Sequence, residues 1–160
     1  ITENVALPLR ERTALGEEEI LARVRKTLGL VGLEKDGEKY PAEISGGMRK
    51  RAGLARAIVG DPEIILYDEP TSGLDPVTSR TIDSLIEQLR GELGVTSVVV
   101  THDLHSALSI GTRIAMLNGG KVSELSTPAE FINSSNEEVR AFLESQFITK
   151  AGSWERNMKQ

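Results

Sequence analysis

The sequence predicts an α/β fold with a parallel sheet at its core, and three observations support this expectation. A short apolar run at residues 64–67 ends in two carboxylates, a pattern typical of a buried strand that reaches the edge of a sheet. The run from Thr96 to Thr101 is β-branched almost throughout and predicts a second buried strand, which ends at His102. Helical patterns separate and flank these two runs, an alternation that indicates a parallel sheet.

Two helices are expected before the first strand. One begins with the acidic run 17–19, because acids are favourable at the positive end of the helix dipole, and ends near Gly29 or Gly32. The mixed pattern before it is assigned no element. After a polar loop, a second helix is expected to begin after the Ser-Gly-Gly at 45–47 and to run to about Val59.

Helix caps and a hairpin follow the first strand. Asp75-Pro76 predicts the N-cap and first turn of a helix that reaches about Leu93. The remaining predicted elements are a short helix over 103–110, a hairpin over 113–125 that turns at Asn118-Gly119-Gly120, and helix starts at Thr127 and Asn136. Asn-Gly is expected to supply the positive φ angles of that turn. The polar tail after Phe147 is expected to fray.

Composition narrows the classes of function. The 160 residues are 39% hydrophobic and 27% charged, which fits one globular domain. The net charge of -5 disfavours a general nucleic-acid binder, and the lack of cysteine excludes disulfides and thiolate metal sites. No apolar stretch is long enough to span a bilayer, and no signal-peptide pattern opens the chain. Because the first residue is Ile1, we expect the chain to begin partway through a gene product.

Asp68 and Glu69 are the first candidate site residues. Two adjacent acids repel each other and are poor core residues, so a cation or a reaction should explain them. Carboxylates at the tip of a strand lie where open α/β sheets bind ligands. Asp68 suits Mg²⁺, which prefers oxygen ligands, and Glu69 could orient and deprotonate a water. The alternative is a polar exit from the strand with no chemistry.

Ser45-Gly46-Gly47 and His102 are the other candidates from residue chemistry. Glycines at a helix start let a phosphate approach free N–H groups, although an ordinary N-cap and loop has the same sequence. The basic residues at 49–51 add charge nearby, and taken alone they indicate a solvated helix face. His102 is expected at the same sheet edge as Asp68, where it could donate to a phosphate oxygen; a histidine satisfied by backbone is the alternative.

Taken together and in order, these motifs resemble those of ATP-binding-cassette (ABC) ATPases. Ile44-Ser45-Gly46-Gly47-Met48 is similar to the signature motif, residues 64–70 to the Walker B strand with its catalytic glutamate, and Ser72-Gly73-Leu74-Asp75 to the D-loop. His102 falls where the switch histidine belongs. The resemblance covers about residues 1–147 and implies an ATPase whose nucleotide lies between two subunits.

The resemblance also implies a role for each residue. Asp68 would hold Mg²⁺ through water, Glu69 would be the general base, and His102 would contact the γ-phosphate. Ser45, Gly46, Gly47 and Met48 would contact ATP bound to the opposite subunit, while Asp75 would couple the two sites. The implied partners are a second ATPase subunit and transmembrane permease subunits, with no nucleic acid. The implied location is cytoplasmic, on the inner face of the cell membrane.

Two departures from the family pattern refine this expectation. The signature carries Ile44 and Met48 in place of the common Leu and Gln, and together with residues 3–10 it resembles the bacterial importer ATPases of phospholipid, toluene-tolerance or lipid-asymmetry type. No Gly-x-x-x-x-Gly-Lys-Ser/Thr phosphate loop (Walker A) occurs in the sequence. We therefore expect a C-terminal portion of the domain, without its N-terminal strands, whose sheet has an unpaired edge and exposed apolar surface that favours dimerisation or strand exchange.

The resemblance implies three segments. Residues 1–47 would be a remnant of the helical subdomain that ends in the signature motif, 48–126 part of the ATPase core, and 127–160 C-terminal helices and tail. The expected function is ATP hydrolysis that drives transport of phospholipid or another apolar substrate, with this segment alone inactive. The alternatives are a non-transport ABC ATPase of DNA-repair or translation type, and a non-catalytic interaction fragment.

Overall fold

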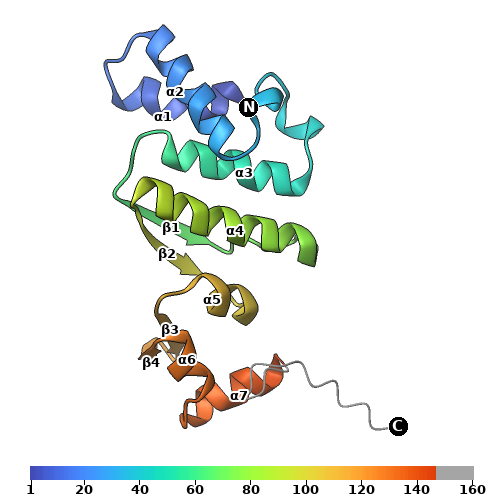
Figure 1. Ribbon diagram of the computed structural model, residues 1–160, viewed down its shortest axis with the longest axis vertical. Helices are drawn as coiled ribbons and strands as arrows, with labels where there is room; N and C mark the ends of the chain where they lie inside the picture. The colour runs from blue at the N-terminus through green and yellow to red at the C-terminus, as the bar shows by residue number, and fades with distance from the viewer. Residues whose placement is uncertain (147–160) are drawn as a thin grey trace. The chain divides into compact units, whose positions relative to one another are not determined.

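The computed structural model describes residues 1–146, which fall into two compact units, Ile1–Val100 and the part from Thr101 onward (Figure 1). The first unit contains α1 (Thr2–Arg12), α2 (Glu17–Leu30), α3 (Gly46–Ile58), β1 (Ile64–Asp68), α4 (Pro76–Leu93) and β2 (Thr96–Val100), with short 3-10 helices at Glu34–Asp36 and Pro41–Glu43. The second contains α5 (Leu104–Ile110), β3 (Ile114–Asn118), β4 (Lys121–Ser126), α6 (Pro128–Ile132) and α7 (Glu137–Ser145).

The helix α1 is not predicted by the sequence pattern. Val5 and Leu9 are buried while Leu7 between them is 46% exposed, so the apolar spacing is helical and not that of a strand. Pro8 lies inside the helix without ending it, although proline lacks an N–H for the helical ladder. Burial of one apolar face against α2 and α3 therefore outweighs the local cost of the proline.

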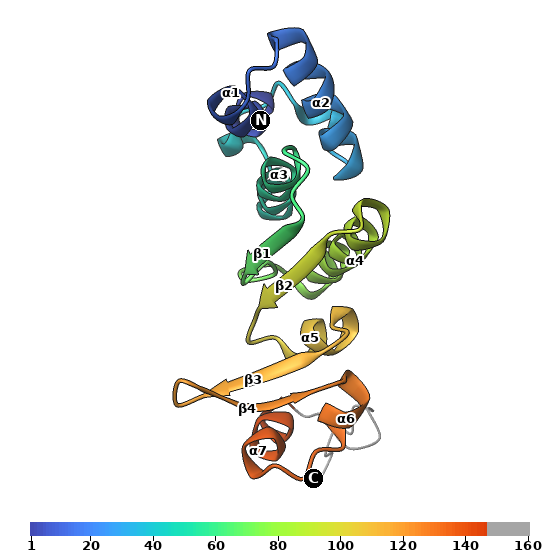
Figure 2. The ribbon, with the colours of Figure 1, turned by 90° about the vertical axis from the view of Figure 1, so that its left-hand side faces the viewer.

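The predicted helices α2 and α3 are confirmed, and each buries apolar residues at helical spacing. Ile20, Val24 and Leu28 of α2 are buried, as are Ala55 and Ile58 of α3. The helix α3 begins at Gly46, directly after Ser45, which is earlier than predicted. In both ribbon views α3 lies between the α1–α2 pair and the layer that contains the two strands (Figure 2).

The two predicted strands pair in parallel, with Asp68 opposite Val100, and α4 connects them. Only one face of β1 is covered: Ile65 and Tyr67 are buried, whereas Leu66 is 76% exposed. The prediction that β2 is buried was wrong, because Val98 and Val100 lie 47% and 54% exposed. Within residues 1–146 the sheet has these two strands alone, and this confirms the expected exposed apolar surface.

The second unit is a hairpin packed with short helices. Its buried cluster consists of Leu104, Ile114, Phe131, Val139 and Leu143. The strands β3 and β4 pair antiparallel as predicted, but the positive φ angles belong to Gly119 and Gly120. Asn118 instead stays in β3, paired with Lys121, because two glycines already supply the backbone that a two-residue turn needs.

The boundaries of the remaining elements agree with the predicted caps. Asp103, Thr127 and Asn136 cap α5, α6 and α7 with their side chains. The strand β2 ends at Val100, two residues earlier than predicted. No helix within residues 1–146 is long and apolar enough to cross a membrane. The division into segments 1–47, 48–126 and 127–160 stays a prediction, and the predicted tail after Phe147 lies outside the described residues.

Candidate functional site

The two predicted acids lie at the carboxyl end of β1. Asp68 is the last residue of the strand and is exposed, and Glu69 follows it half-buried. The Glu69 N–H donates to the carbonyl of Val100 at 2.9 Å, which continues the pairing of β1 with β2 beyond the strand end. Ligands of open α/β sheets bind at the carboxyl ends of the strands, which is where these two acids lie.

Glu69 has an unusual backbone. Its φ is +47°, in the left-handed region that residues other than glycine rarely adopt. The residue before a proline normally prefers an extended backbone with negative φ, and Pro70 follows Glu69 directly. Such a conformation costs on the order of 1–3 kcal/mol and persists only where neighbouring bonds impose it. Strain of this kind occurs often at functional sites.

Those bonds converge on the Glu69 carbonyl. It accepts the Ser72 N–H at 3.2 Å, which closes a turn over residues 69–72, and it accepts the Lys50 Nζ at 2.9 Å. Lys50 comes from α3, nineteen residues away along the chain. The helix that begins at the Ser-Gly-Gly motif is thus bonded directly to the backbone of the second acid.

The signature residues form the first turn of α3. Ser45 is the N-cap, and its hydroxyl accepts the Met48 N–H at 3.2 Å. Gly46 is half-buried and Gly47 is buried. A Cβ atom on Gly47 would lie 2.5 Å from Cγ2 of Thr78 in α4, so this glycine has a packing reason that is independent of any ligand.

Residues 49–51 do not form a single solvated helix face: Arg49 is exposed, but Lys50 and Arg51 are half-buried. Arg49 donates to the Ile44 carbonyl at 2.6 Å, and Arg51 donates to the Val31 carbonyl at 2.8 Å, at the end of α2. Lys50 between them reaches Glu69. Consecutive residues of an α-helix point about 100° apart, so three in a row cannot share one face of a helix that packs on several sides. This helical geometry is the signal in the sequence that could have predicted different directions for the three side chains.

Asp75 caps α4 and bonds to the same Thr78 that faces Gly47. Its carboxylate accepts the Val77 and Thr78 N–H groups, both at 3.0 Å, and the Thr78 hydroxyl. The Thr78 hydroxyl, followed by the backbone bonds, lowers the pKa of the Asp75 carboxyl. Thr78 therefore contacts both Gly47, in the first turn of α3, and Asp75, at the start of α4.

His102 is exposed and belongs to the second unit, whereas the other candidates belong to the first. Its predicted place beside Asp68 stays a prediction. Among residues 1–146 there is no group of three His, Cys, Asp or Glu side chains with metal-binding geometry. The role of Asp68 as a Mg²⁺ ligand stays a prediction.

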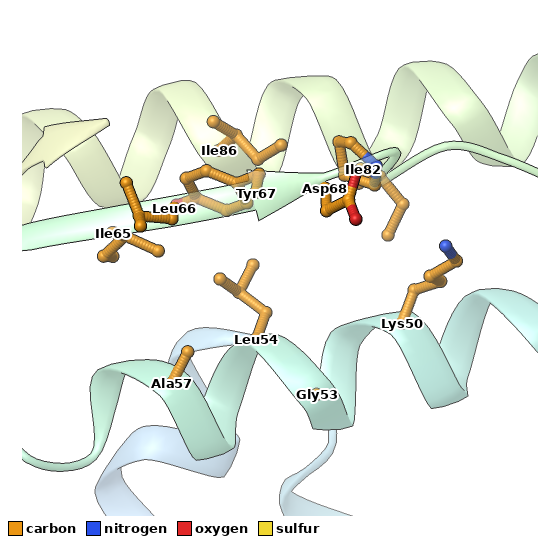
Figure 3. A pocket seen from close by; sticks show the side chains of 11 residues that line it. Lys50, Gly53, Leu54, Ala57, Ile65, Leu66, Tyr67, Asp68, Ile82 and Ile86 are labelled. Carbon is orange, nitrogen blue, oxygen red and sulfur yellow. The ribbon is translucent and has the colours of Figure 1, made fainter. Parts of the chain in front are cut away.

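A cleft that Lys50 and Asp68 help to line lies between α3 and β1. Its wall from α3 includes Lys50, Leu54 and Ala57, which face the β1 side chains in Figure 3, and Lys50 points toward the strand end near Asp68. Its volume is about 170 Å³. Pockets for small molecules usually measure about 300–1,000 Å³, so this cleft is smaller than a typical small-molecule site.

Comparison with known proteins agrees with these features. A family model described as ABC transporter matches residues 2–72. The probable ribonucleotide transport ATP-binding protein mkl of Mycobacterium tuberculosis is 46% identical over 151 residues, which cover 94% of this chain and 42% of that protein. The methionine import ATP-binding protein MetN of Bordetella pertussis is 43% identical over 136 residues, which cover 85% of this chain and 37% of that protein.

A solved structure gives the same result for the fold. The ATP-binding cassette MJ0796, in a dimeric post-hydrolysis state bound to ADP and Pi, matches with a TM-score of 0.68 at 39% identity, over 79% of this chain and 56% of that one. The protein therefore has the α/β fold of ABC ATPases. It contains part of an ABC transporter ATPase domain, and it spans less than half the length of the two curated relatives described above.

Proposed function

We propose that this chain is part of the ATP-hydrolysing subunit of an ABC transporter, with Glu69 as the general base. The observation that carries the proposal is the backbone of Glu69, which is held in a strained conformation by Val100, Ser72 and Lys50 at the end of β1. A base must be held within hydrogen-bond reach of the water that it deprotonates. The backbone that carries the Glu69 carboxylate is restrained by these bonds, at the end of a strand where α/β sheets bind ligands.

The other candidate residues take the roles that the family resemblance implies. Asp68 binds Mg²⁺ through water; its exposed single carboxylate fits an ion that keeps waters and phosphate oxygens as ligands. When bound, Mg²⁺ neutralises charge on the phosphates. His102 donates to the γ-phosphate. Ser45, Gly46, Gly47 and Met48 contact the ATP of the opposite subunit, and Asp75 couples the two sites.

The proposed assembly is a dimer of two ATPase subunits with transmembrane permease subunits, on the cytoplasmic side of the membrane. The MJ0796 cassette is dimeric, which supports the first partner. The relatives described above are named as transport and import proteins, which favours transport over the DNA-repair or translation alternative. ATP turnover by the natural gene product that is lost in Glu69→Gln would exclude the interaction-fragment alternative.

The transported compound is proposed to be a phospholipid or another apolar molecule. This proposal rests on Ile44 and Met48 in the signature and on residues 3–10. The names of the relatives described above mention ribonucleotides and methionine, and not lipids. Stimulation of the ATPase in the assembled transporter by phospholipid, against ribonucleotides and methionine as competitors, would separate these substrate classes.

Glu69→Gln tests the proposed base in the natural gene product, with whatever sequence flanks these residues. Gln keeps the size and the backbone bonds but cannot take a proton, so ATP binding should persist while turnover falls by about 10²–10⁴-fold. Steady-state phosphate release and the dissociation constant for Mg-ATP measure the two effects. Turnover that is unchanged by the substitution would remove Glu69 from the base role.

A further inference from the structure

We propose that Lys50 is a positioning residue for Glu69: its ammonium group holds the Glu69 backbone so that the carboxylate points correctly. The inference rests on the proposed function of Glu69. It gives a role to a residue of α3 that belongs to neither the signature nor the Walker B strand.

The geometry singles out this lysine. Its Nζ lies 2.9 Å from the Glu69 carbonyl in a partly buried bond, and its side chain points from α3 toward the end of β1 (Figure 3). The same carbonyl accepts the Ser72 N–H. A bond from a charged donor is about twice as strong as a neutral one, so Lys50 strengthens the acceptor side of the turn.

The strained φ of Glu69 explains why its carbonyl needs the bond from Lys50. At φ +47° the Glu69 Cβ projects in a direction that an extended backbone would not give it. If the carbonyl is released, the residue before Pro70 can relax toward its ordinary extended conformation. The carboxylate then moves away from the reacting water, and a displacement of about 1 Å can cost on the order of 10²-fold in rate.

The two basic neighbours of Lys50 bond to other carbonyls and do not contact Glu69 in these bonds. Arg49 is bonded to the Ile44 carbonyl before α3, and Arg51 is bonded to the Val31 carbonyl at the end of α2. The Arg51 bond ties α3 to the end of α2, whereas the Arg49 bond is local to the start of α3. Of the three consecutive basic residues, Lys50 is the one that bonds to Glu69.

A lysine beside a strand-end carboxylate could instead bind a phosphate directly, since its ammonium has three donors. The two roles predict different kinetics. A phosphate-binding lysine contributes to nucleotide affinity, so its loss weakens binding. A positioning lysine leaves affinity intact, and its loss lowers kcat alone.

Lys50→Met removes the charge and keeps an unbranched side chain. In the natural gene product we expect kcat to fall about 10–100-fold, with the Mg-ATP dissociation constant changed less than about twofold. Lys50→Arg keeps a donor and should recover at least about a third of the lost activity. The matched control is Lys26→Met on α2, an exposed lysine at which the same substitution should leave kcat unchanged.

Amide exchange supplies a readout without nucleotide. The Ser72 N–H shares the Glu69 carbonyl with Lys50, so its exchange should quicken several-fold in Lys50→Met and stay unchanged in Lys26→Met. Normal kcat, a parallel loss of nucleotide affinity, or unchanged Ser72 exchange in Lys50→Met would each overturn the inference. If Lys50→Met does not fold, a folded Lys50→Arg with less than a tenth of normal kcat overturns it, and one that keeps a third or more with normal Ser72 exchange supports it.

Glu69→Gln shows whether a negative result overturns the base role of Glu69 or only the positioning role of Lys50. If Glu69→Gln turns over ATP normally, the proposed function fails and the role of Lys50 falls with it. If Glu69→Gln stalls hydrolysis while Lys50→Met does not, the base role stands and only the inference about Lys50 is overturned.

Discussion

Gly47 of α3 lies so close to Thr78 of α4 that a methyl group on the glycine would be 2.5 Å from the threonine Cγ2. Thr78 cannot simply turn away, because its hydroxyl donates to the Asp75 carboxylate. Gly47→Ala should therefore strain the contact between the two helices and lower the free energy of unfolding by about 1–3 kcal/mol. Urea denaturation of the 160-residue chain measures this change.

Gly46→Ala is the matched control for that substitution. A methyl group there meets Leu74 at 3.5 Å, an ordinary contact, and alanine is the better helix former. We expect unchanged or slightly raised stability. Thr78→Ser, which removes Cγ2 and keeps the hydroxyl, should restore much of the stability that Gly47→Ala loses. Equal destabilisation by the two alanines would mean that the close contact with Thr78 is not the cause.

Asp75 should give the N-terminus of α4 a dependence on pH. Hydrogen bonds from Thr78 and the backbone lower its pKa in the folded state, so its contribution is present above the unfolded-state pKa and is lost as the pH falls through the folded one. Asp75→Ala should lower Tm at neutral pH by on the order of 2–4 °C. Asp75→Asn still caps the helix and should keep most of the stability, without this acid-side loss.

Melting curves between neutral pH and pH 3 measure both effects. The difference in Tm between the wild type and Asp75→Asn should narrow or reverse toward acid pH, since the wild-type carboxylate becomes protonated there. A difference that stays constant over the whole range would show that the Asp75 charge does not stabilise α4.

Local patterns in the sequence predict much of this architecture. Asp75 caps a helix as expected, Ser45 caps α3 as its ordinary N-cap alternative has it, and the apolar run before Asp68 forms a strand, because caps and strand ends depend on neighbouring residues. The helix around Pro8 could not be predicted, since its stability comes from packing against α2 and α3.

Some features of the candidate site are likewise predictable from neighbouring residues, and others depend on distant contacts. The acids Asp68 and Glu69 are recognisable from adjacent residue types. The contact of Lys50 with the Glu69 carbonyl joins residues nineteen positions apart, and it depends on which way each residue of α3 points. The positive φ of Glu69 is likewise imposed by surrounding bonds, and no local propensity predicts it.

The exposed face of the β1–β2 sheet should make the 160-residue chain self-associate. Leu66, Val98 and Val100 expose apolar surface on a parallel pair of strands, a combination that favours pairing with another copy. Val98→Thr with Val100→Thr keeps the β-branched shape, removes apolar surface and should weaken association several-fold. Thr96→Val should strengthen it. Sedimentation velocity over a hundredfold range of concentration measures the effect, and a wild-type monomer throughout would refute it.

The 160-residue chain by itself should release no phosphate from Mg-ATP above the buffer background. Its sequence contains no Gly-x-x-x-x-Gly-Lys-Ser/Thr loop to hold the phosphates, and the cleft beside Asp68 measures about 170 Å³, below the usual range for small-molecule pockets. Steady-state phosphate release at millimolar ATP is the measurement, with Glu69→Gln in parallel to identify contaminating ATPases. Release by the wild type that disappears in Glu69→Gln would show that these residues bind and hydrolyse ATP without a phosphate loop.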